Sequence, residues 1–189
     1  MLYAGSSGDA IVRQIDPIKG TIVSKYSCAP PSLNDSSFIN SVSASEQVVV
    51  CALSNGTVVA IDDRCSSSSW RISSGNTSAV AHCRGKFIAV GTESGNVSLY
   101  DIRQESIPLW TAKAAHSGAC RSVSLSHSLN HPIVASASFD KKIKIWKNSE
   151  TVTILEDQHT DRVVHVDWSP DGSLVSCGTD STVLLWVDG

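Results

Sequence analysis

Two segments of this chain, about forty residues apart, carry a serine, an aspartate and a tryptophan at the same spacing. In "SASFDKKIKIWK" (residues 136–147) and "SCGTDSTVLLWV" (residues 176–187), the aspartate follows the serine by 4 positions and the tryptophan follows the aspartate by 6. The residues between them are largely alternating apolar and polar, which is typical of half-buried β-strands. The fold must therefore place the same three side chains in the same arrangement twice.

Short apolar runs separated by turn signals recur along the whole sequence, as in "QVVVCAL", "TVVAI", "KFIAVG", "VVHVDW" and "TVLLW". Val, Ile and Thr dominate the apolar positions, and a helical stripe with a period of 3.6 residues is absent. In "WSPDGSL" a proline presets the backbone angle φ and a glycine closes the reversal, which predicts a hairpin. The sequence therefore predicts an all-β fold of short antiparallel strands.

Aligning the hairpins beneath one another gives a repeat. The third strand of each unit is expected to end near Gln14, Ile61, Tyr100, Trp146 and Trp186, which are roughly 39 to 47 residues apart. This period is typical of a four-stranded propeller blade, whereas leucine-rich and ankyrin repeats are shorter. A single unit cannot cover its own apolar faces, so neighbouring units must stack radially. Residues 1–189 are thus predicted to form part of a β-propeller, with units ending near residues 16, 62, 101, 147 and 187.

The last two units resemble WD repeats. Residues 115–148 and 158–189 place His116 and His159 where the family has the histidine of its Gly-His pair, although Ala115 and Gln158 replace the glycine. Lys147 and Val187 replace the terminal aspartate of the family. The resemblance implies a WD-repeat β-propeller in which a histidine, a serine, an aspartate and a tryptophan meet in each of these blades.

The donors and acceptors of these four side chains explain why they belong together. An indole N–H donates to a hydroxyl, the hydroxyl donates to a neutral imidazole nitrogen, and the second imidazole N–H donates to the carboxylate. Leaving one member unpaired would cost about 1 to 3 kcal/mol. The predicted structural tetrads are His116, Ser136, Asp140 and Trp146, and His159, Ser176, Asp180 and Trp186.

Serine, histidine and aspartate are also the residues of a hydrolytic triad. Two identical triads, each with a tryptophan donor and without a glycine-rich nucleophile turn, would be unusual, so a structural brace is favoured. The unit ending at Tyr100 has Val90 and Ser94 at the serine and aspartate positions. No brace is expected there.

About four and a half blades are visible, fewer than the roughly seven of a common closed ring. An open ring leaves strand edges unpaired. The expectation is therefore a fragment of a seven-bladed ring, or an edge that pairs with another copy of the chain.

Several functional classes are disfavoured. The net charge is -3 and no cationic run is present, which argues against nucleic-acid binding. No apolar segment has the roughly 18 residues of a membrane span, and the N-terminus lacks a signal peptide, so the chain is expected to be soluble and cytoplasmic. No nucleotide-binding, metalloprotease or nucleophile-elbow motif occurs, so no enzymatic activity and no cofactor are expected.

Potential metal ligands also have simpler explanations. The 6 cysteines are scattered without a C-x-x-C pair and are expected to be buried free thiols. His127 and His131 precede or border a proline in "SHSLNHP", which favours a loop over a metal site. No metal is expected.

By resemblance, the loops before the first strand of each blade and the turns between its second and third strands share one rim of the propeller. Exposed aromatic and arginine side chains are frequent anchors of interfaces. The alternative for Phe139 is that it only covers a neighbouring side chain. The predicted partner-binding residues on this rim are Glu93, Arg121, Phe139, Arg162 and Thr179.

The function expected from this resemblance is a non-catalytic scaffold for protein–protein interaction. The order of segments is similar to the second propeller of actin-interacting WD-repeat proteins, which implies actin and cofilin as partners. "SLYDIRQ" resembles the box by which some WD-repeat proteins dock on the cullin-4 ubiquitin-ligase adaptor, with Arg103 as the contact, although Asp-x-Arg also ends ordinary blades. A generic complex scaffold is the third alternative.

Overall fold

A computed structural model describes residues 1–6, 8–28, 37–45, 48–62, 67–73, 79–104, 107–128 and 132–187. Within these ranges the chain forms strands β1 to β18 and no helix. The all-β prediction is confirmed. None of the described segments forms a helix with the length and apolar character of a membrane span.

The strands form antiparallel sheets, each built from strands that follow one another in the chain. The first sheet contains β1 (Leu2–Ala4), β2 (Ile11–Asp16) and β3 (Thr21–Ser27), and the second contains β4 (Ile39–Ser45), β5 (Val48–Leu53), β6 (Thr57–Asp62) and β7 (Ser67–Ser73). The third contains β8 (Ala79–Arg84), β9 (Phe87–Thr92), β10 (Val97–Asp101) and β11 (Pro108–Ala112). The fourth contains β12 (Cys120–Leu125), β13 (Val134–Ser138), β14 (Ile143–Lys147) and β15 (Glu150–Leu155), and the fifth contains β16 (Val163–Trp168), β17 (Leu174–Gly178) and β18 (Val183–Trp186).

The hairpin between β16 and β17 illustrates how local sequence sets the register. Gly172 has a φ of 93°, a conformation that L-residues with a side chain rarely adopt. Its N–H donates to the oxygen of Ser169 at 3.1 Å, and the Asp171 carboxylate accepts the N–H of Ser173 at 2.9 Å. The turn predicted from "WSPDGSL" is therefore present, and it aligns Trp168 with Leu174 across the pair.

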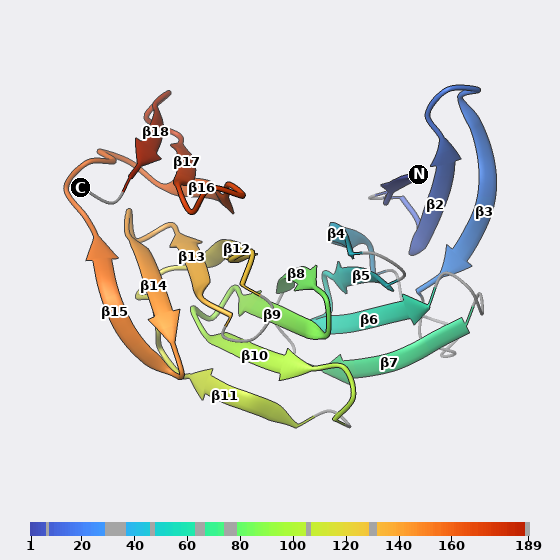
Figure 1. Ribbon diagram of the computed structural model, residues 1–189, viewed down its shortest axis with the longest axis horizontal. Coiled ribbons are helices and arrows are strands. Elements are labelled where there is room, and N and C mark those ends of the chain that lie inside the picture. Colours follow the sequence, from blue (N-terminus) through green and yellow to red (C-terminus); the bar gives the residue numbers. More distant parts are fainter. Residues whose placement is uncertain are drawn as a thin grey trace.

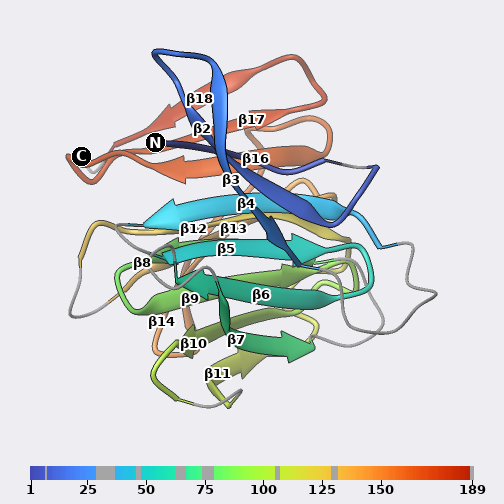
Figure 2. The same ribbon diagram turned by 90° about the vertical axis from the view of Figure 1, so that its right-hand side faces the viewer.

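The sheets stand side by side along an open arc, with the first and fifth sheets facing each other across its gap (Figure 1). Strands β4, β8, β12 and β16 line the inside of the arc, and β7, β11 and β15 lie on its outside. Figure 2 shows β4, β5, β6 and β7 of the second sheet following one another from the inside of the arc to its outside. This arrangement is the propeller geometry predicted from the repeat.

The core lies between neighbouring sheets and not within any one of them. Val50 of the second sheet packs with Ile88 and Val90 of the third, and both faces of this contact are closed to solvent. The seam between the fourth and fifth sheets is filled by Ala135, Ile143, Val163, Val166 and Leu174, among others. Each sheet thus depends on its neighbours to cover its apolar residues.

Free thiols contribute to these seams. Five of the cysteines lie in the described residues and are free: Cys28, Cys51, Cys83, Cys120 and Cys177. All except the half-buried Cys177 are buried, and burial raises the pKa of Cys120 to about 12. Cys65 lies outside the described residues.

The strands predicted as the third of each unit are β2, β6, β10, β14 and β18, which end at Asp16, Asp62, Asp101, Lys147 and Trp186. Each of the first four is followed by an outermost strand. The first and fifth sheets have three strands each in the described residues. The total of seven blades stays a prediction.

The outer face of the fifth sheet is apolar and uncovered. Val183 and Leu185 of β18 are 72% and 66% exposed, and Val187 beyond the strand is 66% exposed. The corresponding strand of the fourth sheet has the same alternation, but the fifth sheet covers its Ile143 completely. Among the described residues no strand pairs with the outer edge of β18. An exposed apolar face beside such an edge favours self-association.

We expect the double substitution Val183→Ser and Leu185→Ser to reduce self-association of the chain, because it removes two of the most exposed apolar side chains from this face. Static light scattering over a concentration series would measure the effect. Ile18→Ser is the matched control, since Ile18 is 93% exposed in the turn between β2 and β3 of the first sheet. Equal scattering by the double variant and the unmodified chain would contradict the prediction.

Candidate functional site

The fourth sheet contains a directed chain of hydrogen bonds. Trp146 Nε1 donates to Ser136 Oγ at 2.8 Å, and His116 Nε2 lies 2.8 Å from the same hydroxyl. His116 Nδ1 lies 2.9 Å from Asp140 Oδ2. Burial lowers the pKa of His116, so its ring is neutral and Nε2 accepts the Ser136 proton while Nδ1–H donates to Asp140. The structure thus brings all four residues of the first predicted tetrad together.

The fifth sheet repeats the arrangement. Trp186 Nε1 donates to Ser176 Oγ at 2.9 Å, and His159 bridges Ser176 and Asp180 at 2.8 and 3.0 Å. The Thr182 hydroxyl adds a bond of 2.7 Å to Asp180 Oδ1. Hydrogen bonds from Thr182 and from His159 lower the pKa of Asp180, which is therefore ionised.

The buried position of these relays favours a brace over a catalytic triad. Ser136 and Ser176 are 0% and 1% exposed, and each hydroxyl already accepts an indole proton. A nucleophilic serine must instead reach its substrate. A groove of about 480 Å³ runs between the fourth and fifth sheets, but of the relay residues only Trp186 lines it. Among the described residues, no three potential metal ligands gather at one point.

The third sheet has a different arrangement at the equivalent positions. Val90 and Tyr100 are buried where the relay would need a serine and a tryptophan. The Ser94 hydroxyl lies 2.9 Å from that of Thr92, within its own turn. A histidine-to-tryptophan relay therefore has no hydroxyl at its centre in this sheet.

Neighbouring innermost strands are joined by a second set of bonds that sequence reasoning missed. In each of these bonds, a side chain of one innermost strand accepts a backbone N–H of the next innermost strand, or of the turn that follows it, and so satisfies a donor that its own sheet need not pair. Residues 40 to 44 positions apart are joined in this way. The bonds run from Cys83 N to Ser43 Oγ (3.1 Å), from Gly85 N to Ser45 Oγ (2.9 Å), from Leu125 N to His82 Nδ1 (2.9 Å), from Val166 N to Ser122 Oγ (3.2 Å) and from Trp168 N to Ser124 Oγ (3.2 Å).

The only signal for these bonds in the sequence is a polar residue at alternate positions of the first strand in each unit, as in "SVSAS" and "RSVSL". Alternation of this kind ordinarily indicates a solvent-exposed strand face. The pattern therefore could not show that the hydroxyls face another strand.

His82 occupies a special position among these bonds. Because its Nδ1 accepts the Leu125 N–H, this nitrogen carries no proton. Burial lowers the pKa of His82 to about 4, and Arg84, His165 and His127 act in the same direction against the opposing charge of Asp167.

The predicted partner-binding rim gathers around Phe139. The guanidinium carbon of Arg162 lies 4.9 Å from the centre of the Phe139 ring, and that of Arg121 lies 5.4 Å from it. Both arginines are exposed and the ring is half-buried. Thr179 is exposed and its N–H donates to the Arg162 oxygen at 2.9 Å, whereas Glu93 is exposed in a turn of the third sheet.

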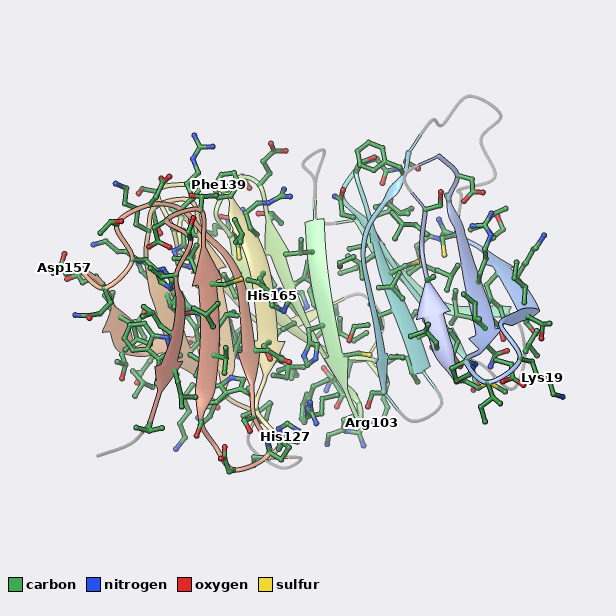
Figure 3. All side chains as sticks on the ribbon, turned by 90° about the horizontal axis from the view of Figure 1, so that it is seen from above. Lys19, Arg103, His127, Phe139, Asp157 and His165 are labelled. Atoms are coloured by element: carbon green, nitrogen blue, oxygen red, sulfur yellow. The ribbon has the colours of Figure 1, made fainter. Side chains whose placement is uncertain are left out.

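Arg103 and His127 lie on the opposite rim from Phe139 (Figure 3). Arg103 donates to both oxygens of Asp101, with the shortest contact at 2.6 Å, although its side chain remains 64% exposed. The Asp-x-Arg segment thus closes its own strand end. His131, the second histidine of the weighed pair, lies outside the described residues.

Comparison with known proteins identifies the family. A β-propeller family model described as the Nucleolar protein 10-like, N-terminal domain matches residues 1–185. The chain belongs to this family. Its fold is that of the WD-repeat β-propellers, as the resemblance implied.

Curated relatives of this Nucleolar protein 10-like propeller match parts of it. The probable cytosolic iron-sulfur protein assembly protein 1 of Kluyveromyces lactis is 29% identical over 66% of this chain and 37% of its own length. The ribosome biogenesis protein WDR12 homolog of Nematostella vectensis is 35% identical over 52% of this chain and 24% of its own. The chain thus spans well under half of either relative.

A solved structure shares the fold of the Nucleolar protein 10-like propeller. The computationally designed Ika4 protein superposes with a TM-score of 0.69 at 22% identity, over 83% of this chain and 95% of the designed one. At this identity the similarity concerns the fold alone.

We expect Asp180→Ala to lower the melting temperature, because it removes the acceptor of the His159 ring, of the Thr182 hydroxyl and of the Thr160 N–H. Asp171→Ala, in an exposed hairpin turn, should lower it less. Circular dichroism melts would measure both. A melting temperature unchanged by Asp180→Ala would contradict the role of the relay as a brace.

Acidification should destabilise the protein through His82. Its pKa is lowered from 6.5 to about 4 on folding, so the unfolded chain binds the proton first, and this contribution to stability is present above pH 6.5 and lost as the pH falls towards 4. The loss should be on the order of 2 to 3 kcal/mol. Urea titrations between pH 7 and 4 would measure it. His82→Gln keeps an acceptor without a titrating ring, and an equally steep pH dependence in this variant would exclude His82 as the cause.

Proposed function

We propose that this chain is a non-catalytic docking domain that binds another protein on the rim around Phe139. The observation that carries the proposal is the half-exposed Phe139 ring with the Arg121 and Arg162 guanidiniums beside it. Aromatic and arginine side chains are the residues in which interface binding energy concentrates. The burial of both relay serines supports a non-catalytic role, since neither hydroxyl is accessible to a substrate.

The backbone holds this rim in place. The Phe139 N–H donates to the Ala119 oxygen at 3.0 Å, and the Thr179 N–H donates to the Arg162 oxygen at 2.9 Å. Phe139 belongs to the fourth sheet and Arg162 to the loop before the fifth, so the rim spans two sheets. A surface whose backbone is fixed before binding loses less conformational entropy when a partner arrives.

We infer that the setting of this docking is ribosome assembly in the nucleolus. The family description refers to a nucleolar protein, and one of the two curated relatives described above is named as a ribosome biogenesis protein. The other relative is named as an assembly protein for iron-sulfur proteins. Both names fit a domain that assists assembly. The cytoplasmic location expected from the lack of a signal peptide and a membrane span stays a prediction, since one relative is named as a cytosolic assembly protein and the family description refers to a nucleolar protein.

The two narrower partners remain predictions with less support. Docking on a cullin-4 adaptor would have to use an Arg103 guanidinium that already binds Asp101. Neither relative described above is named as a binder of actin or cofilin, and the motifs here carry no residue for that role. Co-sedimentation with actin filaments and cofilin is the direct test of the latter.

We expect Phe139→Ala and Arg162→Ala to lose the same set of captured ribosome-assembly proteins when the tagged propeller is exposed to nucleolar extract. Quantitative mass spectrometry of the captured proteins would measure the loss. Both variants should melt within a few degrees of the unmodified chain, because the fixing bonds of the rim use backbone atoms.

Arg103→Ala is the matched control on the opposite rim, and it should retain these proteins (Figure 3). Retention of all partners by Phe139→Ala and Arg162→Ala would contradict the proposed surface. Selective loss of a ligase adaptor by Arg103→Ala would favour the ubiquitin-ligase alternative instead.

A further inference from the structure

The arginines beside Phe139 differ from Arg13 and Arg103 in having no carboxylate within ion-pair distance. Arg13 is bound to Asp9 and Arg103 to Asp101, both at 2.6 Å. Within the described part of the chain, neither Arg121 nor Arg162 has an ion pair within 4.0 Å.

The carboxylate nearest in sequence is already engaged. Hydrogen bonding with the Arg162 backbone and with Thr179 lowers the pKa of Asp161, and the charges of Lys141 and Arg162 act in the same direction. The carboxylate is therefore ionised, although no ion pair within 4.0 Å joins it to the Arg162 guanidinium. Lys141, in the same turn as Phe139, is exposed and uses its ammonium group to donate to the Thr160 oxygen at 2.9 Å. Asp140 and Asp180, the other carboxylates of this rim, belong to the relays and their side chains are only 6% and 3% exposed. The exposed charges beside the ring are therefore mainly positive.

The Phe139 ring orients these cations without neutralising them. A guanidinium over an aromatic face is held by the negative charge of that face, while its N–H groups remain free to donate at the edge. Those edges match a carboxylate in two parallel hydrogen bonds. The site thus combines an apolar contact with two donors already in position.

The separation of the two cations limits what can bind. Because both guanidinium carbons lie about 5 Å from the ring centre, they are at most about 10 Å apart. An extended chain covers that distance in about three residues, at roughly 3.3 Å each. A single peptide segment can therefore reach both arginines and the ring between them.

We infer that this rim binds an acidic peptide segment of the partner protein, in which two carboxylates lie within about three residues of each other and the chain between them contacts Phe139. The inference rests on the proposed docking function and adds the chemistry of the bound segment. Nucleic acid fits less well, because a phosphate backbone requires a longer row of cations than these, and the chain as a whole has a net charge of -3.

The test uses the purified chain and fluorescein-labelled peptides of about twelve residues, with binding measured by fluorescence anisotropy. One peptide contains Glu-Leu-Glu in a neutral Gly/Ser background, and its matched control contains Gln-Leu-Gln. We expect the acidic peptide to bind at least about fivefold more tightly, with an affinity that falls as salt rises. Equal binding of the two peptides would overturn the inference.

Variants assign the effect to the two arginines. Arg121→Gln and Arg162→Gln should each weaken binding about two- to fivefold, which is the range for exposed ion pairs. Arg103→Gln, which removes an exposed arginine from the opposite rim, should leave binding unchanged. Arg162→Glu should lose the acidic peptide and gain affinity for a Lys-Leu-Lys peptide. An equal loss for Arg103→Gln, or no exchange of preference in Arg162→Glu, would exclude this site.

Two further ligands test the chemistry. A peptide with phosphoserine in place of the glutamates and a single-stranded RNA of equal length should not bind more than about tenfold more tightly than the acidic peptide. If either does, the inference of a carboxylate partner is wrong. Capture from nucleolar extract that depends on Phe139 while the acidic peptide fails to bind would retain the docking function and reject only its acidic ligand.

Discussion

The arc of sheets depends on hydrogen bonds between neighbouring innermost strands. In these bonds a backbone N–H of one strand donates to a side chain of the strand before it. An innermost strand is paired on one edge only, so its remaining N–H groups would face the channel without a protein partner. Ser43, His82 and Ser122 each accept one of these groups from the following sheet. These bonds fix the distance and the angle between sheets, while the apolar seams behind them provide the area that holds the sheets together. The arrangement explains why one sheet could not fold alone.

The relays connect this architecture to the rim. Asp140 Oδ2 accepts one hydrogen bond from His116 Nδ1–H and another from the Ser117 N–H. These two bonds connect the loop before β12 to the turn after β13. Phe139 is the residue next to Asp140 in that turn, and Thr179 is next to Asp180 in the equivalent turn of the fifth sheet. A brace that is closed to solvent thus holds in place the residues that are exposed on the rim. Within its described residues, the third sheet has neither such a relay nor an arginine over an aromatic ring.

Much of the fold could be predicted because its signals are local. Period-two alternation, β-branched composition and turn residues specify strands, and the repeat of about forty residues specifies blades. The relay could be predicted as well, because the resemblance to WD repeats implied it and the donors and acceptors of its four side chains match one another. The bonds between innermost strands could not be predicted. Serines at alternate positions give the same sequence pattern whether their hydroxyls face water or the backbone of a neighbouring strand. Likewise, only the structure shows that the Arg103 guanidinium binds the Asp101 carboxylate. This ion pair weakens the ubiquitin-ligase interpretation. The resemblance to actin-interacting proteins rested on segment order, and the family match identifies the Nucleolar protein 10-like propellers instead.

The sequence by itself determined the strands, their grouping into units and the composition of the two relays, because each of these depends on residues that are close in the chain or repeat at a fixed interval. Only the tertiary structure decided which side chains of different units meet. Arg121 and Arg162 are 41 positions apart in the chain, yet both reach the same Phe139 ring because two neighbouring sheets present their loops on one rim. The approach of both arginines to one ring depends on the angle between the two sheets. That angle is set by the packing between sheets, which no local sequence pattern encodes.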